Sequence, residues 1–263
     1  MKQFATLLFS FSLLVLATSC QKDPSADIRP EAACKLIKAY YFDETGAIGD
    51  SLVYTYTGNK ITKGANADGY VTFDYTNDRI TKRTIYDAGS PELDTYDVIT
   101  YTSDGKLKNI KKYYNFTNQT IPAEQYDFIY SGNKLEKLDV SYYDPIISQY
   151  ELYETTAFTY TGENITRSIT TQAIGGGLKD TFSYAHDANK NYFTKSNAFL
   201  LDLIFFEEIA GEAIPLFMSS NNVINIFEGG DEFPLSYKPD DKENLFEWYF
   251  EGNLASRYLY DCK

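Results

Sequence analysis

The side chains that could catalyse a reaction are few. His186 is the only histidine among the 263 residues, so a Ser-His-Asp or Cys-His centre would have to use it. It stands in the polar stretch AHDANK, which we expect to be a turn, and the chain has no Gly-x-Ser-x-Gly nucleophile motif. We therefore interpret His186 as an exposed turn residue. With one histidine and three cysteines, a zinc site built on several such side chains is excluded.

Acidic clusters are a second place where chemistry could occur. They are Glu207–Glu208, Asp231–Glu232, and the group Asp240, Asp241, Glu243 and Asn244. A glycosidase needs two carboxylates held across a cleft, and a calcium site needs several oxygens that converge from one loop. The spacing fits no calcium loop, and the Gly175–Gly177 run lacks the Gly-Lys-Ser/Thr ending of a phosphate loop. We therefore expect solvated loops, no catalytic residue, no metal site and no cofactor.

Aromatic side chains could bind a sugar, because an apolar ring face with a polar edge suits a pyranose. The chain has 24 tyrosines and 18 phenylalanines. The candidates for ligand stacking are tyrosines outside the regular strand pattern or in connections: Tyr113, Tyr143, Tyr153 and Tyr192. The alternative, which we favour, is that they are ordinary strand residues that cover neighbouring hairpins.

Cys20 is the candidate for a covalent modification. Residues 1–19 carry one charge, at Lys2, then an apolar run and small residues, which predicts a secretion signal rather than a membrane span. The stretch LATSC resembles a bacterial lipobox, and this resemblance implies that Cys20 is lipidated on its sulfur after cleavage. The polar residues 20–33 then form a flexible tether. The alternative is an ordinary signal peptide followed by an unlipidated cysteine.

Two further cysteines, Cys34 and Cys262, stand at the two ends of the expected folded region, residues 34–263. Exported chains are oxidised, so the two can pair if the first and last strands approach within about 7 Å. Closing so long a loop would stabilise the folded state by ~4 kcal/mol on the chain-entropy model. Two buried free cysteines are the alternative, and the sequence leaves both open.

The charge balance limits the partners. With 37 acidic and 24 basic residues, the formal net charge is −13, so nucleic acid and anionic headgroups would repel the chain. The dense basic cluster contains Lys106, Lys108, Lys111 and Lys112, which we interpret as the solvated face of one hairpin. We expect no nucleic-acid partner, a membrane contact through the lipid at Cys20, and a glycan or a protein as the remaining partner.

A short repeated phrase in the sequence predicts the elements that carry these candidate residues. The phrase YTGNKI at 56–61 recurs as YSGNKL at 130–135, and related phrases follow other aromatic residues. The anchor residues of the copies are Tyr56, Tyr75, Tyr101, Tyr130, Tyr160, Tyr184, Met218 and Phe250. Residues two before each anchor are mostly aromatic or aliphatic, with polar residues between, which predicts strands with one face in the core. Gly and Asn after the anchor tolerate the positive φ of a hairpin turn, so each copy is one β-hairpin.

Residues 196–211 depart from this pattern. Phe199, Leu203 and Phe206 fall at helical spacing, and Gly211 could end a helix. We predict a short helix near 197–209 that packs on the sheet. An additional buried strand pair is the competing interpretation.

The Tyr-ending strand, the Gly/Asn/Asp turn and the return strand resemble the tyrosine-aspartate hairpin repeats of the RHS type. The chain is similar to a family of Bacteroidota prolipoproteins whose domain has no assigned function, and the resemblance covers residues 34–263. It rests on the preceding lipobox, the YTGNKITK-like hairpins and the segment SSNNVIN before a closing hairpin. The family has no known catalytic residues. Lys22 and Asp23 after the lipobox resemble the export signal of such lipoproteins, which implies an outer-membrane anchor and exposure at the cell surface.

These observations predict an all-β fold: an antiparallel meander of about eight hairpins, curled into an open barrel-like sheet. A β-sandwich is the alternative fold. For function we expect a non-enzymatic outer-membrane lipoprotein that is structural or binds a protein. A glycan-binding lipoprotein for nutrient capture is the alternative, and a carboxylate-based hydrolase is third.

Overall fold

The computed structural model describes residues 34–89, 93–114, 122–173, 177–195 and 213–262. The description below concerns the folded unit that ends the chain, Ala32–Lys263, within these ranges. The predicted signal peptide (1–19), the predicted tether (20–33) with Cys20, and the predicted helix near 197–209 lie outside the described residues.

The described residues form strands and two short helices. The first eight strands are β1 (Lys35–Phe42), β2 (Ile48–Thr57), β3 (Lys60–Ala65), β4 (Gly69–Thr76), β5 (Arg79–Asp87), β6 (Leu93–Tyr101), β7 (Leu107–Tyr114) and β8 (Glu124–Ser131). They are followed by β9 (Lys134–Asp144), β10 (Gln149–Thr161), β11 (Asn164–Gln172), β12 (Lys179–Lys190), the 3₁₀ helix η1 (Tyr192–Lys195), α2 (Ile214–Met218), β13 (Asn221–Glu228), β14 (Asp231–Pro239), β15 (Leu245–Phe250) and β16 (Asn253–Asp261).

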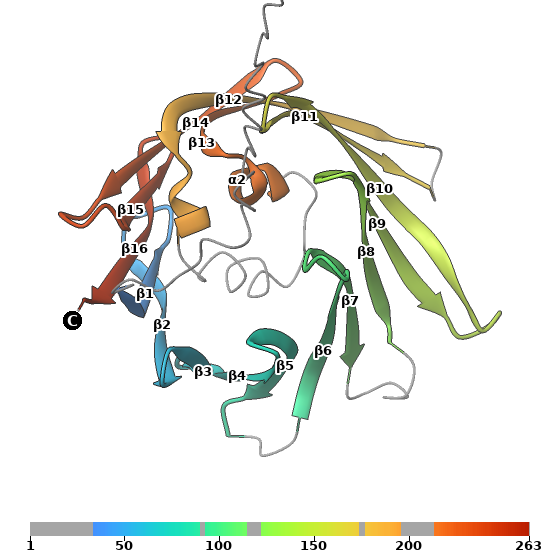
Figure 1. Cartoon of the computed structure of the whole chain (residues 1–263), viewed down its shortest axis with the longest axis horizontal. Coiled ribbons are helices and arrows are strands. Elements are labelled where there is room, and N and C mark those ends of the chain that lie inside the picture. Colours follow the sequence, from blue (N-terminus) through green and yellow to red (C-terminus); the bar gives the residue numbers. More distant parts are fainter. Residues whose placement is uncertain (1–33, 90–92, 115–121, 174–176, 196–212, 263) are drawn as a thin grey trace, which may run out of the picture. The chain divides into compact units, whose positions relative to one another are not determined.

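The strands form one closed antiparallel barrel. Each strand pairs with the next along the chain, and β1 pairs with β16, Lys35 opposite Asp261. Figure 1 shows the strands in sequence order around a ring. The predicted curled meander is therefore confirmed, closure by β1 and β16 goes beyond the predicted open sheet, and the sandwich alternative is wrong.

Residue alternation decides which side chains line the interior. In β2, Leu52 and Tyr54 are buried while Val53 and Thr55 are exposed, because successive side chains of a strand point to opposite faces. The same parity holds around the ring. The buried apolar core includes Leu36, Ala39, Val71, Phe73, Ile99, Ile110, Tyr126, Phe128, Leu138, Val140, Phe158 and Ile165.

A β-bulge stands beside each of the first five anchor tyrosines. In β2 and β3, Thr55 pairs with Lys63 but Tyr56 pairs with Ile61, so Thr62 is the extra residue. The same shift adjoins Tyr75, Tyr101, Tyr130 and Tyr160. A bulge increases the local twist of a strand pair, so its recurrence at one level helps the sheet to curl.

The two ends of the barrel differ. The tyrosine-turn end is defined by the turns at 58–59, 77–78, 102–106, 132–133 and 162–163, and the loop end by the connections at 43–47, 66–68, 145–148, 229–230 and 251–252. A disulfide joins Cys34 and Cys262 next to the first residue pair of β1 and β16.

Three of the predicted anchors have other roles. Tyr184 lies inside β12 and shares a 2.7 Å hydrogen bond with the Ser168 hydroxyl. Met218 ends α2, and Phe250 precedes a turn at the loop end. Residues 191–220 separate β12 from β13 at the tyrosine-turn end, where Asn164 bonds Asn221 (2.9 Å). The tight turns after this insertion therefore fall at the opposite end, and Tyr237 is the late residue equivalent to the anchors.

Candidate functional site

The anchor tyrosines join neighbouring strands. The hydroxyl groups of Tyr56, Tyr75 and Tyr101 each donate 2.8 Å hydrogen bonds to the backbone carbonyls of Leu36, Ile61 and Ile80, and Tyr237 donates to Val223 (2.7 Å). Burial raises the pKa of Tyr75 and of Tyr101 to about 12. These hydroxyls therefore remain protonated donors near neutral pH, and their role is structural.

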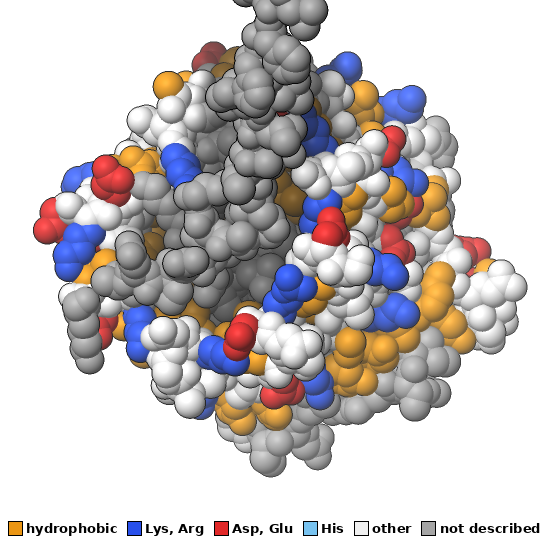
Figure 2. Space-filling model, viewed as in Figure 1, with side chains coloured by type: hydrophobic (Ala, Val, Ile, Leu, Met, Phe, Trp, Pro, Cys, Tyr) orange, Lys and Arg blue, Asp and Glu red, His pale blue; other side chains and the backbone are white. Residues whose placement is uncertain are grey.

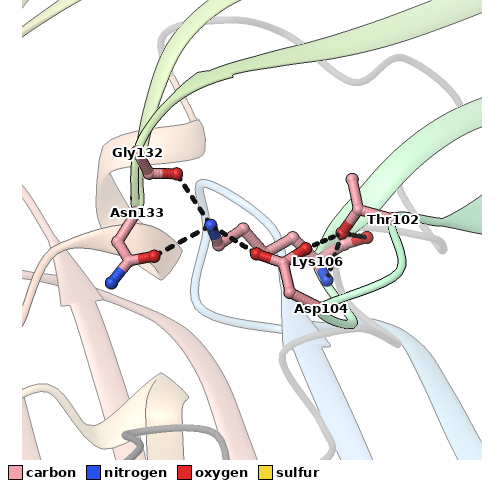
Figure 3. A network of polar contacts seen from close by, with 5 residues as sticks. All are labelled: Thr102, Asp104, Lys106, Gly132 and Asn133. Carbon is pink, nitrogen blue, oxygen red and sulfur yellow. Dashed lines mark hydrogen bonds and ion pairs between the residues drawn. The ribbon is translucent and has the colours of Figure 1, made fainter.

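The lysine of the repeated phrase holds the next turn. Lys106 Nζ lies 5.3 Å from the Tyr130 ring centroid and donates to the Gly132 carbonyl (2.8 Å) and to Asn133 Oδ1 (3.0 Å). Asp104 accepts from the same ammonium group at 2.8 Å, as Figure 3 shows. The same arrangement places Lys35, Lys60, Arg79 and Lys134 over the rings of Tyr56, Tyr75, Tyr101 and Tyr160. The whole phrase YTGNKI thus recurs because it builds the tyrosine-turn end.

A polar cluster faces the barrel interior on β5 to β8. Arg83 and Asp97 stand opposite each other and form an ion pair whose side chains are both 4% exposed. Lys112 stands opposite Asp97 and is 3.4 Å from Glu124. The cluster contains equal numbers of basic and acidic groups. The free-energy cost of burying each charge is therefore offset by an opposite charge nearby.

The Arg83–Asp97 pair is incompletely bonded. Arg83 Nε and Asp97 Oδ1 are buried and have no hydrogen-bond partner among the described residues. Burial raises the pKa of the Asp97 carboxyl, against the lowering effects of Arg83 and Lys112. Buried polar groups almost always have a hydrogen-bond partner, so two buried polar atoms without one are unusual.

Glu124, in contrast, is fully engaged. Its two oxygens accept hydrogen bonds from the Tyr114 and Tyr126 hydroxyls, at 2.5 and 2.8 Å. Burial, and then the Glu124 contact, raise the pKa of both tyrosines well above the ordinary value. Glu124 therefore fixes the positions of two tyrosine hydroxyls.

A hollow of about 210 Å³ lies beside Arg83. Its lining comes from β2 to β5 and the 66–68 loop, and consists of Leu52, Gly64, Asn66, Asp68, Gly69, Tyr70, Val71, Arg83, Ile85, Tyr86 and Asp87. Gly69 allows β4 and β5 to approach, because a Cβ there would stand 2.1 Å from the Tyr86 carbonyl oxygen. Asp68 and Asp87 are exposed while Arg83 is buried, so the hollow runs from the loop end inward.

The β9–β10 hairpin carries the most exposed apolar side chains. Ile146 at its tip is 90% exposed, and Ile147, Leu152, Tyr142 and Tyr150 are also exposed. The Ile146 amide donates to Asp144 Oδ1 (2.7 Å), which fixes the tip. Figure 1 shows this hairpin projecting at the right, and Figure 2 shows hydrophobic side chains gathered on that side.

The four predicted stacking tyrosines do not form one platform. Tyr113 faces outward and stacks on Tyr96, with ring centroids 4.5 Å apart. Tyr143 contacts Tyr150 edge-on (5.4 Å), and Tyr153 contacts Tyr142 in the same manner (5.0 Å). Tyr192 is remote from these in η1 and lies 6.2 Å from Tyr237. Three of the four therefore belong to the β7–β10 region.

His186 and the lysine cluster differ from the prediction. His186 lies half-buried in strand β12, not in an exposed turn, with Nε2 3.1 Å from the Ser219 hydroxyl. Burial lowers its pKa. Lys112 was predicted to be solvated but is buried beside Glu124, because it shares the inward parity of Ile110.

The acidic clusters that the structure describes shape loops. Asp240 Oδ1 accepts from the amides of Lys242 (2.9 Å) and Asn244 (2.8 Å), and Asp231–Glu232 begin β14 in exposed positions. Glu207–Glu208 lie outside the described residues. Within the described ranges, no group of three or more His, Cys, Asp or Glu side chains is placed to hold a metal ion.

Sequence reasoning missed the Arg83–Asp97 cluster, although a signal was present. Asp97 stands four residues before Tyr101, at a position whose parity faces the core. A charged residue there requires a buried partner. Its partner Arg83 could not be identified without the register of β5 on β6.

Comparison with known proteins identifies a fold. No protein-family model matches the chain, and no curated protein sequence matches it. A porin-like protein from Bacteroides uniformis aligns with 86% of this chain and 98% of its own, with a TM-score of 0.52 and 11% identity. At that identity the similarity shows a shared fold alone.

Two other solved structures align at lower scores. A porin-like protein from Bacteroides vulgatus covers 88% of this chain and 99% of its own, with a TM-score of 0.44 and 12% identity. The Tc holotoxin pore of Photorhabdus luminescens covers 85% of this chain and 12% of its own, with a TM-score of 0.35 and 13% identity. Within the described residues, no helix is long and apolar enough to cross a membrane. The RHS-type and prolipoprotein resemblances stay predictions.

Proposed function

We propose that this chain is a non-enzymatic, lipid-anchored barrel of the outer membrane that binds a protein partner through its β9–β10 hairpin. The observation that carries the partner-binding role is the exposed apolar tip, with Ile146 90% exposed. Contiguous exposed apolar surface on a folded protein marks an interaction site. The anchor rests on the lipobox LATSC before the tether.

The outward face of the barrel supports anchoring by lipid. Its strands carry charged outward-facing side chains, which include Lys38, Lys63, Asp74, Lys82, Lys111, Asp127, Lys137, Asp139, Arg167 and Arg257. Figure 2 shows such charges scattered over the visible face. A membrane-spanning barrel has the reverse alternation, with apolar residues outside and polar residues inside. The described barrel surface therefore suits water, and the lipid at Cys20 supplies the membrane attachment.

The hairpin has the form of a recognition element. β9 has 11 residues and β10 has 13, whereas the flanking strands β8 and β11 have 8 and 9. The extra length carries the apolar tip beyond its neighbours. Its tyrosine contacts between the two strands, Tyr143 with Tyr150 and Tyr142 with Tyr153, help to hold the strands together at the base of the tip.

Photo-cross-linking on living cells tests this role. A photoreactive residue is placed at Ile146 or, as an exposed control at the same barrel end, at Ile48, which is 58% exposed. We expect a discrete heavier species from position 146 alone. That species should be lost when Ile147→Ser and Leu152→Ser are added. Equal patterns at positions 146 and 48 would contradict the proposal.

A second candidate function is glycan capture, which the polar hollow beside Arg83 favours. A carboxylate-based hydrolase is less well supported. Both oxygens of Glu124 are held by tyrosines, and one oxygen of Asp97 is held by Arg83. A hydrolytic pair needs carboxylates free to reach substrate and water.

A further inference from the structure

The hollow beside Arg83 combines an apolar wall with a polar base and rim. Leu52, Val71 and Ile85 supply the wall, and Gly64 adds no side chain to it. At the rim, the Asn66 side chain accepts hydrogen bonds from the amides of Asp68 (3.1 Å) and Gly69 (2.9 Å). The rim is therefore fixed before any ligand arrives, which lowers the entropic cost of binding.

The base of the hollow offers one strong donor. Arg83 lines the hollow, its side chain is 4% exposed, and its Nε has no partner among the described residues. A buried donor left without a partner costs free energy. Nε itself is buried, so a ligand oxygen in the hollow can bond the Arg83 guanidinium only where that side chain still reaches the surface.

The surrounding charges decide the class of ligand. Asp97 already neutralises Arg83, and the exposed carboxylates of Asp68 and Asp87 stand at the rim. An anion entering the hollow would meet these two carboxylates without a free cation to offset them. A neutral hydroxylated ligand avoids this repulsion, because each hydroxyl both donates and accepts.

We infer that the hollow binds one neutral saccharide unit. The Arg83 guanidinium donates to a ligand oxygen, the Asp68 and Asp87 carboxylates accept from ligand hydroxyls, and the Leu52–Val71–Ile85 wall contacts the apolar ring face. This inference rests on the second candidate function, glycan capture. It is independent of the hairpin and its protein partner.

The volume sets the size of the ligand. About 210 Å³ is far above the ~10–15 Å³ that a cavity needs to hold one water molecule. One sugar ring fits this space, while a longer glycan would extend past the rim at Asp68 and Asp87. If the hollow serves only to hold water, added sugar will have no effect on stability.

A thermal-shift titration of the full-length chain in detergent tests the inference. The probes are methyl glycosides of glucose, galactose and mannose, with glucuronate and inorganic phosphate as anionic comparisons. We expect at least one neutral glycoside to raise the unfolding midpoint in a saturable manner, since a ligand bound only to the folded state stabilises it. The anions should produce no shift.

Two variants localise the effect. Ile85→Phe fills the hollow without removing the ion pair, and Arg83→Lys keeps a cation for Asp97 but removes the guanidinium group. Both should abolish the shift, whereas Ile226→Phe, on the inward face of β13, should retain it. Circular dichroism and the sugar-free midpoint verify that each variant folds.

Three results would overturn the inference: no shift with any neutral glycoside, a shift with the anions alone, or a shift that Ile85→Phe retains. The first would remove the saccharide and leave a water-filled hollow. The second would reverse the ligand class, and the third would move the site elsewhere. None of these results alters the cross-linking expected at Ile146, so the failure of this inference and that of the hairpin proposal are distinguishable.

Discussion

At the scale of single residues, the repeated tyrosine does more than fill the core. Tyr101 is typical: its ring packs inside the barrel, its hydroxyl bonds the Ile80 carbonyl, and Arg79 lies over its face at 5.3 Å. One side chain thus joins two strands and positions the Arg79 guanidinium beside a turn. Sequence alternation predicted the ring's burial, but the hydroxyl partner depends on the register of β5 and β6.

Removing that hydroxyl should weaken the barrel modestly. Tyr101→Phe deletes the bond to Ile80 and leaves the ring in place, so the free energy of unfolding should fall by about 1 kcal/mol. Urea denaturation measures the change. Tyr40→Phe is the matched control, since Tyr40 faces outward beneath Lys38 and its hydroxyl bonds no described residue. An equal loss in both variants would contradict a stabilising role for the bond between the Tyr101 hydroxyl and the Ile80 carbonyl.

Alkaline pH should loosen the same contacts. Burial raises the pKa of Tyr75, Tyr101 and Tyr160 to about 12 from the ordinary 10. The folded state holds these protons more tightly than the unfolded state, so their contribution is complete below pH ~10 and is lost as the pH rises to ~12. Unfolding measured across this window, with tyrosinate absorbance to follow ionisation, checks the sign. Full ionisation of the folded protein near pH 10 would contradict it.

At the scale of elements, the hairpin was the part that could be predicted. Gly-Asn after a tyrosine and strict alternation before it are local signals, and Gly58, Gly132 and Gly162 adopt φ values of 60°, 59° and 59°. What local signals could not supply is pairing at a distance. The β1–β16 closure, the Arg83–Asp97 pair and the reversal of the turns after residues 191–220 all depend on where strands meet in space.

Gly132 provides the element-scale prediction. Its φ of 59° lies in the left-handed region, and nothing stands within 4 Å of an added Cβ. Gly132→Ala should therefore cost only backbone strain, about 1 kcal/mol of unfolding free energy. Gly49→Ala is the control, because Gly49 lies in β2 and its nearest neighbours would be 3.8 Å from the Cβ. Thermal unfolding of the two variants should differ; identical midpoints would reject the turn assignment.

At the scale of the whole folded unit, closure and charge placement are the observations on which the proposed function rests. The β1–β16 ladder and the Cys34–Cys262 disulfide close the ring, so none of the sixteen described strands is left at an unpaired sheet edge, where aggregation could start. Apolar side chains fill the interior while charged side chains such as Asp74, Lys82 and Lys137 face outward. This arrangement is the basis for proposing a barrel that stands in water and is held to the membrane by lipid.

The most direct test of that central claim is the membrane partition of a chain without the lipid. Residues 1–19 are replaced by a cleavable export signal and Cys20 by Ala, and the chain is compared with the wild type after cell fractionation and an alkaline wash. We expect wild-type chain in the outer-membrane fraction and folded variant in the aqueous fraction. A variant that stays integral to the membrane would rule out attachment by lipid alone, because the barrel itself would then be the anchor.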